Sequence, residues 1–124
     1  MRFKAVRAKL LAGINAVKDV TKNESVENPF RFIKVETMGT DCVLLTATDG
    51  NMQITSRVFC EVSEEGRLSL VGPRFARFVA GLPEGPVEIW DSSVSRASIE
   101  GAGTKFTLAR GTVDDFPVMK GPAS

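Results

Sequence analysis

The sequence contains no histidine, and this absence excludes a large part of enzyme chemistry. Histidine is the commonest general base, and it activates the nucleophile in serine–histidine and cysteine–histidine pairs. A mechanism based on lysine or a carboxylate stays open, but no pattern of residues points to one. We therefore expect a protein that is not an enzyme.

Cysteine is also scarce, and long apolar runs are missing. Cys42 and Cys60 are the only cysteines, and each lies in an apolar stretch that favours β-structure. Two sulfurs without a histidine make a poor metal site, so we expect two buried thiols in a reducing compartment rather than a disulfide. No apolar run reaches membrane-spanning length and no leader peptide is recognisable, so we expect a soluble, cytoplasmic protein with no membrane partner.

Two short motifs could suggest a cofactor, but neither has the required pattern. Residues 101–105 read Gly-Ala-Gly-Thr-Lys, which lacks the spacing of a phosphate-binding loop and precedes an expected strand instead of a helix. Asp114 and Asp115 could be imagined holding a metal, but no further ligands lie nearby in the sequence, and a solvated loop explains them better. We expect no cofactor and no metal.

The residues that are present fit one compact domain, since 43% of the 124 residues are hydrophobic and 25% are charged. Residues 2–6 alternate as a short strand. Residues 7–20 form a predicted helix, because its apolar side chains recur at the spacing of one helical face. A second, short helix is predicted over residues 74–81, opened by Pro73 at a position where proline is tolerated.

The remaining β-favouring runs predict strands at residues 30–36, 42–48, 52–58, 68–70, 87–91, 94–99 and 104–109. Asp49-Gly50 is expected to make a tight hairpin turn. This order predicts an α+β fold in which two helices pack on an antiparallel β-sheet layer. We assign residues 1–118 to one domain and 119–124 to a truncated interdomain linker. No internal repeat is visible.

Positive charge is concentrated on the two predicted helices. Segments 7–22 and 73–81 carry six basic residues against Asp19, a net +5, whereas the rest of the chain carries ten basic and fourteen acidic residues, a net −4. A solvated face of an amphipathic helix explains this pattern without any ligand. Contacts with nucleic-acid phosphates, which carry no sequence information and weaken with salt, are the alternative. Base stacking on single strands is not expected, because the basic face has no aromatic residues.

Several stretches together are similar to one known family. These are Met1-Arg2-Phe3 with Leu10-Leu11, the run from Leu45 to Ile54, the run from Pro73 to Gly85, Lys105 to Leu108, and Asp114 to Pro117. In this order and spacing the chain resembles the bacterial DNA sliding clamp, the β subunit of DNA polymerase III. The resemblance covers residues 1–117.

The resemblance implies a processivity factor, a ring that encloses double-stranded DNA and tethers the replicative polymerase. Each clamp domain places its two helices toward the hole, so Lys9, Lys22, Arg74 and Arg77 become candidates for contacts with DNA phosphates. Two departures weaken this contact. The loop after Lys22 contains two glutamates, and Ala80 stands where the family commonly has an arginine.

In this family the outer edge of the first domain pairs with the third domain of a second subunit in a dimeric ring. The matching positions here are Arg74, Arg96, Lys105, Phe106 and Leu108. The alternative for Phe106 and Leu108 is that they are ordinary core residues of the last strand. A clamp subunit has three such domains, and this chain has room for one. We therefore expect the polymerase and the clamp loader to bind only through domains that are absent here.

Two other functions stay open at this stage. A protein-interaction module of clamp ancestry would pair edge to edge and ignore DNA, and Glu24, Glu27 and Ala80 favour it. An unrelated α+β enzyme has no candidate general base or metal cluster in the sequence to support it.

Overall fold

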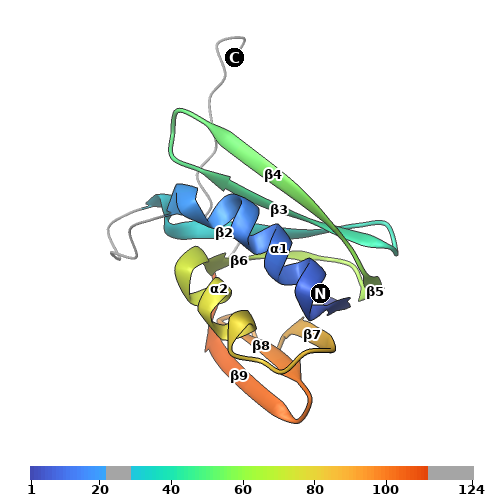
Figure 1. The fold of residues 1–124 in the computed structure, drawn as a ribbon. Helices are drawn as coiled ribbons and strands as arrows, with labels where there is room; N and C mark the ends of the chain where they lie inside the picture. The colour runs from blue at the N-terminus through green and yellow to red at the C-terminus, as the bar shows by residue number, and fades with distance from the viewer. Residues whose placement is uncertain (22–28, 112–124) are drawn as a thin grey trace.

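The fold is described from a computed structural model, which defines residues 1–21 and 29–111. It contains two α-helices, two 3₁₀ helices and nine strands within these residues (Figure 1). The elements in chain order are β1 (Arg2–Val6), α1 (Arg7–Val17), η1 (Lys18–Thr21), η2 (Pro29–Arg31), β2 (Phe32–Met38), β3 (Cys42–Thr48), β4 (Gln53–Phe59), β5 (Glu61–Glu64), β6 (Arg67–Val71), α2 (Gly72–Ala80), β7 (Pro86–Asp91), β8 (Arg96–Gly101) and β9 (Thr104–Ala109). The predicted α+β fold with two helices and antiparallel strands is confirmed.

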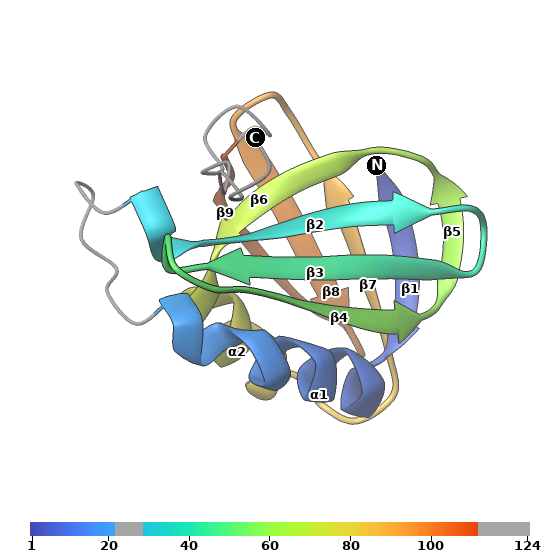
Figure 2. The same cartoon turned by 90° about the horizontal axis from the view of Figure 1, so that it is seen from above.

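The strands form two antiparallel sheets instead of one. One sheet has the order β5-β1-β7-β8-β9 and the other has the order β4-β3-β2-β6. Figure 2 shows the second sheet lying in front of the first, with both helices along one side of the molecule. The core lies between the sheets and under the helices, and its largest fully buried side chains include Phe3, Leu10, Ile33 and Phe75.

The topology contains a repeat that the sequence does not reveal. A strand, a helix and three hairpin-connected strands occur first as β1-α1-β2-β3-β4 and again as β6-α2-β7-β8-β9. The first strand of each unit crosses over to pair with the other unit's sheet, since β1 pairs with β7 and β6 pairs with β2. Within the described residues, the edge strands are β5 and β9 in the first sheet and β4 and β6 in the second, so β4 and β9, the last strands of the two units, occupy matching edges.

Most predicted bounds differ from the observed ones by one or two residues, and the strand predicted over residues 94–99 spans Arg96–Gly101. The first helix ends at Val17 and continues as the 3₁₀ helix η1. The hairpin after β3 is longer than the tight turn expected, because the Asp49 carboxylate accepts hydrogen bonds from the amides of Asn51 and Met52, both at 2.9 Å. The short strand β5 was not predicted, and it pairs with β1 at the edge of the five-stranded sheet.

An ion-pair cluster fixes the start of β1 against the end of β7. The α-ammonium group of Met1 donates a hydrogen bond to Asp91 at 2.9 Å, and Arg110 donates to the second Asp91 oxygen at 3.0 Å. Burial alone would raise the pKa of the Asp91 carboxyl, but the hydrogen bond and charge of the α-ammonium group, together with Arg110, hold that pKa below its ordinary value. Asp91 is therefore an ionised partner of both cations at neutral pH.

No helix in the described parts of the chain is long and apolar enough to cross a membrane. Among the same residues, histidine, cysteine, aspartate and glutamate side chains form no group of three or more that could hold a metal ion. Both cysteines are free thiols, with Cys42 buried and Cys60 half-buried. Burial, followed by the nearby Cys42 and acidic side chains, raises the pKa of Cys60 to about 11.

Candidate nucleic-acid interface

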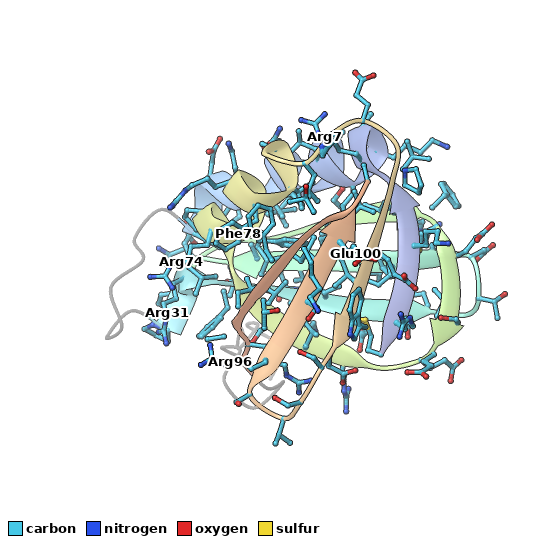
Figure 3. The ribbon with its side chains drawn as sticks, turned by 90° about the horizontal axis from the view of Figure 1, so that it is seen from below. Arg7, Arg31, Arg74, Phe78, Arg96 and Glu100 are labelled. Atoms are coloured by element: carbon cyan, nitrogen blue, oxygen red, sulfur yellow. The ribbon has the colours of Figure 1, made fainter. Side chains whose placement is uncertain are left out.

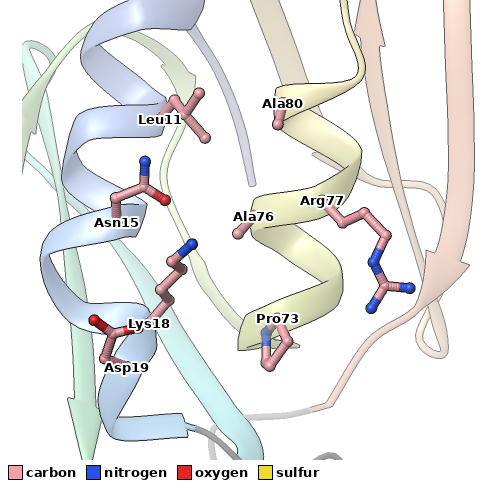
Figure 4. A pocket seen from close by; sticks show the side chains of 8 residues that line it. All are labelled: Leu11, Asn15, Lys18, Asp19, Pro73, Ala76, Arg77 and Ala80. Carbon is pink, nitrogen blue, oxygen red and sulfur yellow. The ribbon is translucent and has the colours of Figure 1, made fainter.

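The two helices run side by side in opposite directions and leave a groove between them. Figure 4 shows Leu11 of α1 opposite Ala80 of α2, and Asn15 opposite Ala76. The groove has a volume of ≈ 520 Å³ and is lined by Leu11, Asn15, Lys18, Asp19, Pro73, Ala76, Arg77 and Ala80. The small side chains of α2 allow an elongated ligand to approach close to the helix backbone.

Arg7 ties the beginning of α1 to the end of α2. Its guanidinium group donates hydrogen bonds to the carbonyl oxygens of Val79 at 3.2 Å and Ala80 at 2.8 Å. These carbonyls lie in the last turn of α2, where no following helical turn supplies amide groups to donate to them. A cation is also electrostatically favourable at this end of a helix. Arg7 therefore fixes the relative position of the helices at this end of the groove.

The basic residues of the helices fall into two groups. Lys18 lines the groove, and Figure 4 shows its ammonium group pointing into the space between the helices. Arg77 also borders the groove, but Figure 4 shows its side chain pointing away from α1. Arg74 is exposed on the same helix as Arg77. The structure thus places Lys18 and Arg77 at one groove, with Asp19 as an acidic neighbour, whereas Arg74 lies on α2 outside the groove lining.

Lys9 is not part of this group. It lines a separate hollow with Phe59 and Pro86, on the flank of α1 that faces away from α2. Helical geometry explains the separation, because Lys9 lies two residues from the groove-lining Leu11 and is rotated about 200° from it around the helix. Lys22, the fourth residue expected to contact DNA, lies outside the described residues.

Lys18 was counted among the basic residues of the first helix but was not selected as a DNA contact. Its spacing carried a usable signal, since Lys18 follows Leu11 by seven residues and therefore shares its side of the helix. The sequence alone did not show which flank of α1 faces α2, so it could not distinguish Lys18 from Lys9.

The residues expected at a subunit interface lie on or beside β8 and β9. Arg96 and Lys105 are exposed, whereas Phe106 is half-buried and stacks on Phe78 of α2 with ring centroids 4.8 Å apart. Leu108 is only 8% exposed and belongs to the core of this domain. In Figure 3, the side chains of Arg31, Arg74 and Arg96 lie on the same side of the view. Arg31, which no sequence pattern pointed to, has its guanidinium carbon 4.2 Å from the centroid of the Phe32 ring.

Comparison with known proteins assigns the family. The profile of the family described as DNA polymerase III beta subunit, N-terminal domain, matches residues 1–120. The chain belongs to this family. A comparison with curated proteins gives no match.

Solved sliding clamps have the same fold as this clamp domain. The DNA polymerase sliding clamp of Caulobacter crescentus superposes with a TM-score of 0.89 at 26% identity, over 98% of this chain and 33% of that clamp. The sliding clamp of Pseudomonas aeruginosa, solved with griselimycin, gives a TM-score of 0.88 at 23% identity and covers the same shares of the two chains, 98% and 33%. The Helicobacter pylori beta clamp, solved with a DNA ligase peptide, gives 0.88 at 16% identity, over 97% of this chain and 33% of that one. The clamp domain therefore spans about a third of the length of the solved clamps that it matches.

Proposed function

We propose that this chain acts as the first domain of a DNA sliding clamp, a non-catalytic processivity factor of the bacterial replicative polymerase. Its helices would face duplex DNA inside a ring of such domains. Membership of the polymerase III beta family supports this proposal. The observation that carries the DNA-facing role is the basic groove between α1 and α2, with Lys18 and Arg77 at its border.

The charge and shape of the groove suit a phosphate backbone. Over the described helical residues 7–21 and 72–80, five basic residues stand against one acidic residue, Asp19, so the surface attracts anions. The alanines of α2 expose little side chain that could read base edges. Such a surface favours phosphate contacts without sequence preference, which a protein that slides along DNA requires. We assign Lys18, Arg77 and Arg74 to the near contacts, with Lys9 more distant and Lys22 as a further candidate.

We propose further that β9 forms the ring contact with the third domain of a second subunit. β9 is an edge strand, and an unpaired edge carrying an apolar residue is a site for strand addition. Phe106, Lys105 and Arg96 would contact the partner directly. Leu108 would support β9 mainly from the core, because little of its side chain is exposed. Arg74 precedes Phe78 by about one helical turn, and Phe78 packs on Phe106 of β9. We therefore assign Arg74 both to the DNA-facing surface and to the ring contact.

Salt-dependent retention on heparin or on immobilised duplex DNA tests the groove. We expect weak binding, because one domain encloses nothing. Replacing Lys18 and Arg77 together with glutamate should weaken retention strongly and reduce the salt slope by about 2, since each phosphate that is no longer neutralised lowers that slope by about 0.9. The charge-matched control is Lys4→Glu with Arg57→Glu, which changes two exposed cations outside the groove. Equal losses in both double variants would mean that only net charge matters and would sink the groove assignment.

Sedimentation of the 124-residue chain with an added clamp third domain tests the edge. A heterodimer should form and should be lost in Phe106→Glu. The matched control is Thr55→Glu, which places the same charge on β4, an edge strand of the other sheet. A complex that survives Phe106→Glu but not Thr55→Glu would move the ring contact to β4.

A further inference from the structure

A second hollow lies where the beginning of α1 meets the end of β4. It has a volume of ≈ 220 Å³ and is lined by Lys4, Ala5, Val6, Lys9, Phe59, Cys60, Glu61 and Pro86. Sites for drug-sized ligands usually occupy roughly 300–1,000 Å³. This Val6–Phe59 hollow therefore suits one or two inserted side chains rather than a whole cofactor.

The hollow is bordered by two apolar side chains that are unusually exposed. Val6 is 51% exposed and Phe59 is 61% exposed. Val6 also occupies the N-cap of α1, where its side chain makes no capping hydrogen bond. Serine, threonine, aspartate and asparagine are strongly preferred at that position, and valine is among the least favoured residues. As the last residue of β1, paired with Pro86, Val6 suits its strand position. Burial within this domain does not account for its exposed side chain, which a partner would cover.

The rim of the hollow attracts acidic groups. Lys4 and Lys9 are exposed on it, and Glu61 is the one acidic side chain among the lining residues. Glu88 also lies beside Lys4 and interacts with its charge, but the Glu88 carboxylate is already paired with Arg2 at 2.7 Å. The first turn of α1 contains no acidic residue, so the partial positive charge of the helix N-terminus is not offset locally. Apolar walls with a net positive rim are complementary to an apolar side chain flanked by carboxylates.

We propose that the Val6–Phe59 hollow binds a short segment of a partner protein in which an apolar side chain lies between acidic residues. The apolar side chain fills the space between Val6, Phe59 and Pro86, and the flanking carboxylates pair with Lys4 and Lys9. This site is separate from the proposed DNA-facing groove, because it lies on the opposite flank of α1 and shares none of the groove's lining residues. It is also separate from β9.

Peptide titration of the ¹⁵N-labelled chain, followed by amide chemical shifts, tests the site. The probe is the N-acetylated, C-amidated pentapeptide Glu-Glu-Leu-Glu-Glu. Saturable shifts should be confined to residues 4–9 and 59–61. The same peptide with alanine in place of leucine should bind at least tenfold more weakly, and Lys-Lys-Leu-Lys-Lys should not bind. Equal binding of the alanine peptide, or shifts centred on the groove between α1 and α2, would show charge attraction alone and overturn the proposal.

Variants separate this site from the groove. Val6→Ser and Phe59→Ser should each weaken leucine-peptide binding at least tenfold, and Lys4→Glu should also weaken it. Val94→Ser is the matched control, because Val94 is 85% exposed in the turn between β7 and β8 and should leave binding unchanged. Val6→Ser and Phe59→Ser should leave retention on heparin unaltered. Failure of the DNA-binding proposal for the groove would therefore leave the peptide-binding proposal for the hollow standing. Undiminished peptide binding in Val6→Ser and Phe59→Ser would overturn it. Self-association of the chain that depends on Phe59 would overturn it too, by assigning the hollow to a second copy.

Discussion

The two halves of the domain share one topology but hold their helices against the sheets in different ways. In the first half, α1 approaches the sheet so closely at Gly13 that an added Cβ atom would lie 2.4 Å from a methyl group of Val58 on β4. In the second half, α2 packs through phenylalanines. Phe75 is fully buried, and Phe78 stacks on Phe106 of β9. Close backbone approach also occurs in α2, but at Gly72 and toward Thr21 of η1. Against the sheets, the same arrangement of elements is thus stabilised once by close backbone approach and once by aromatic side chains.

This difference has a consequence for the surface of each half. The first helix can lie deep because glycine removes a side chain, so its outer flanks remain open to form the groove and the hollow. The second helix is held to its edge strand by the Phe78–Phe106 stack, which couples the proposed DNA-facing element to the proposed ring edge. Removing an aromatic side chain should therefore destabilise the second half, whereas adding a methyl group under the helix should destabilise the first. Substitutions can measure the two effects separately.

The largest effect is expected where an aromatic side chain is removed from the second half. Phe75→Ala should destabilise the chain by about 3–5 kcal/mol, because it leaves a cavity under α2. The melting temperature should fall by roughly 10 °C or more. The control is Phe59→Ala, since Phe59 is exposed and its loss should change stability by less than about 0.5 kcal/mol. Urea unfolding of both variants measures the comparison, and similar losses would contradict the buried role of Phe75.

A smaller loss is expected where a methyl group is added to the first half. Helix propensity alone would make Gly13→Ala stabilising by about 1 kcal/mol. The contact with Val58 should reverse the sign and give a net loss of about 1–3 kcal/mol, because valine has little rotamer freedom to move aside. Gly81→Ala is the control, since its Cβ would meet neighbours only at ordinary distances of 3.5 Å and beyond. In a double-mutant cycle, Val58→Ala should recover part of the loss caused by Gly13→Ala. Independent, additive effects would show that the close contact is not what limits this site.

Local patterns predicted most elements, whereas contacts distant in sequence decided what was missed. The strands over residues 42–48 and 104–109 were predicted with the observed bounds, because each is a short β-favouring run between turn signals. The division into two sheets was not predicted, since alternation shows that a strand has two faces but not which strand lies beside it. The same limit applied at the site. Helical spacing predicts that Lys9 and Lys18 lie on different sides of α1, but only the packing of α2 shows that Lys18 borders the groove.

An ion-pair cluster joins the two halves at the junction of β1 and β7. Asp91→Asn removes the charge that Met1 and Arg110 share, and we expect a loss of about 1–2 kcal/mol at pH 7, since Asp91 is partly exposed. The folded-state pKa of Asp91 is lowered, so the stabilisation is fully present above the unfolded pKa of about 3.9 and disappears as the pH falls through the folded pKa. Urea unfolding from pH 7 to pH 2.5 should therefore show wild type and variant converging below about pH 4. A constant difference across this range would mean that the carboxylate charge is not the cause.

The smallest effect is expected at the two helix N-caps, and it is the only one with a stabilising sign. Both helices begin after a valine that makes no capping hydrogen bond, Val6 before α1 and Val71 before α2. Val6→Ser should stabilise the chain by about 0.5–1 kcal/mol, because serine can accept a hydrogen bond from the first turn and the exposed valine loses little packing. Val71 is more buried, so Val71→Ser should gain less or lose stability. Thermal unfolding of the two variants decides the comparison. A stabilised Val6→Ser that no longer binds the acidic leucine peptide would show that valine is retained there for binding at the expense of stability, whereas a destabilised Val6→Ser would return Val6 to an ordinary packing role.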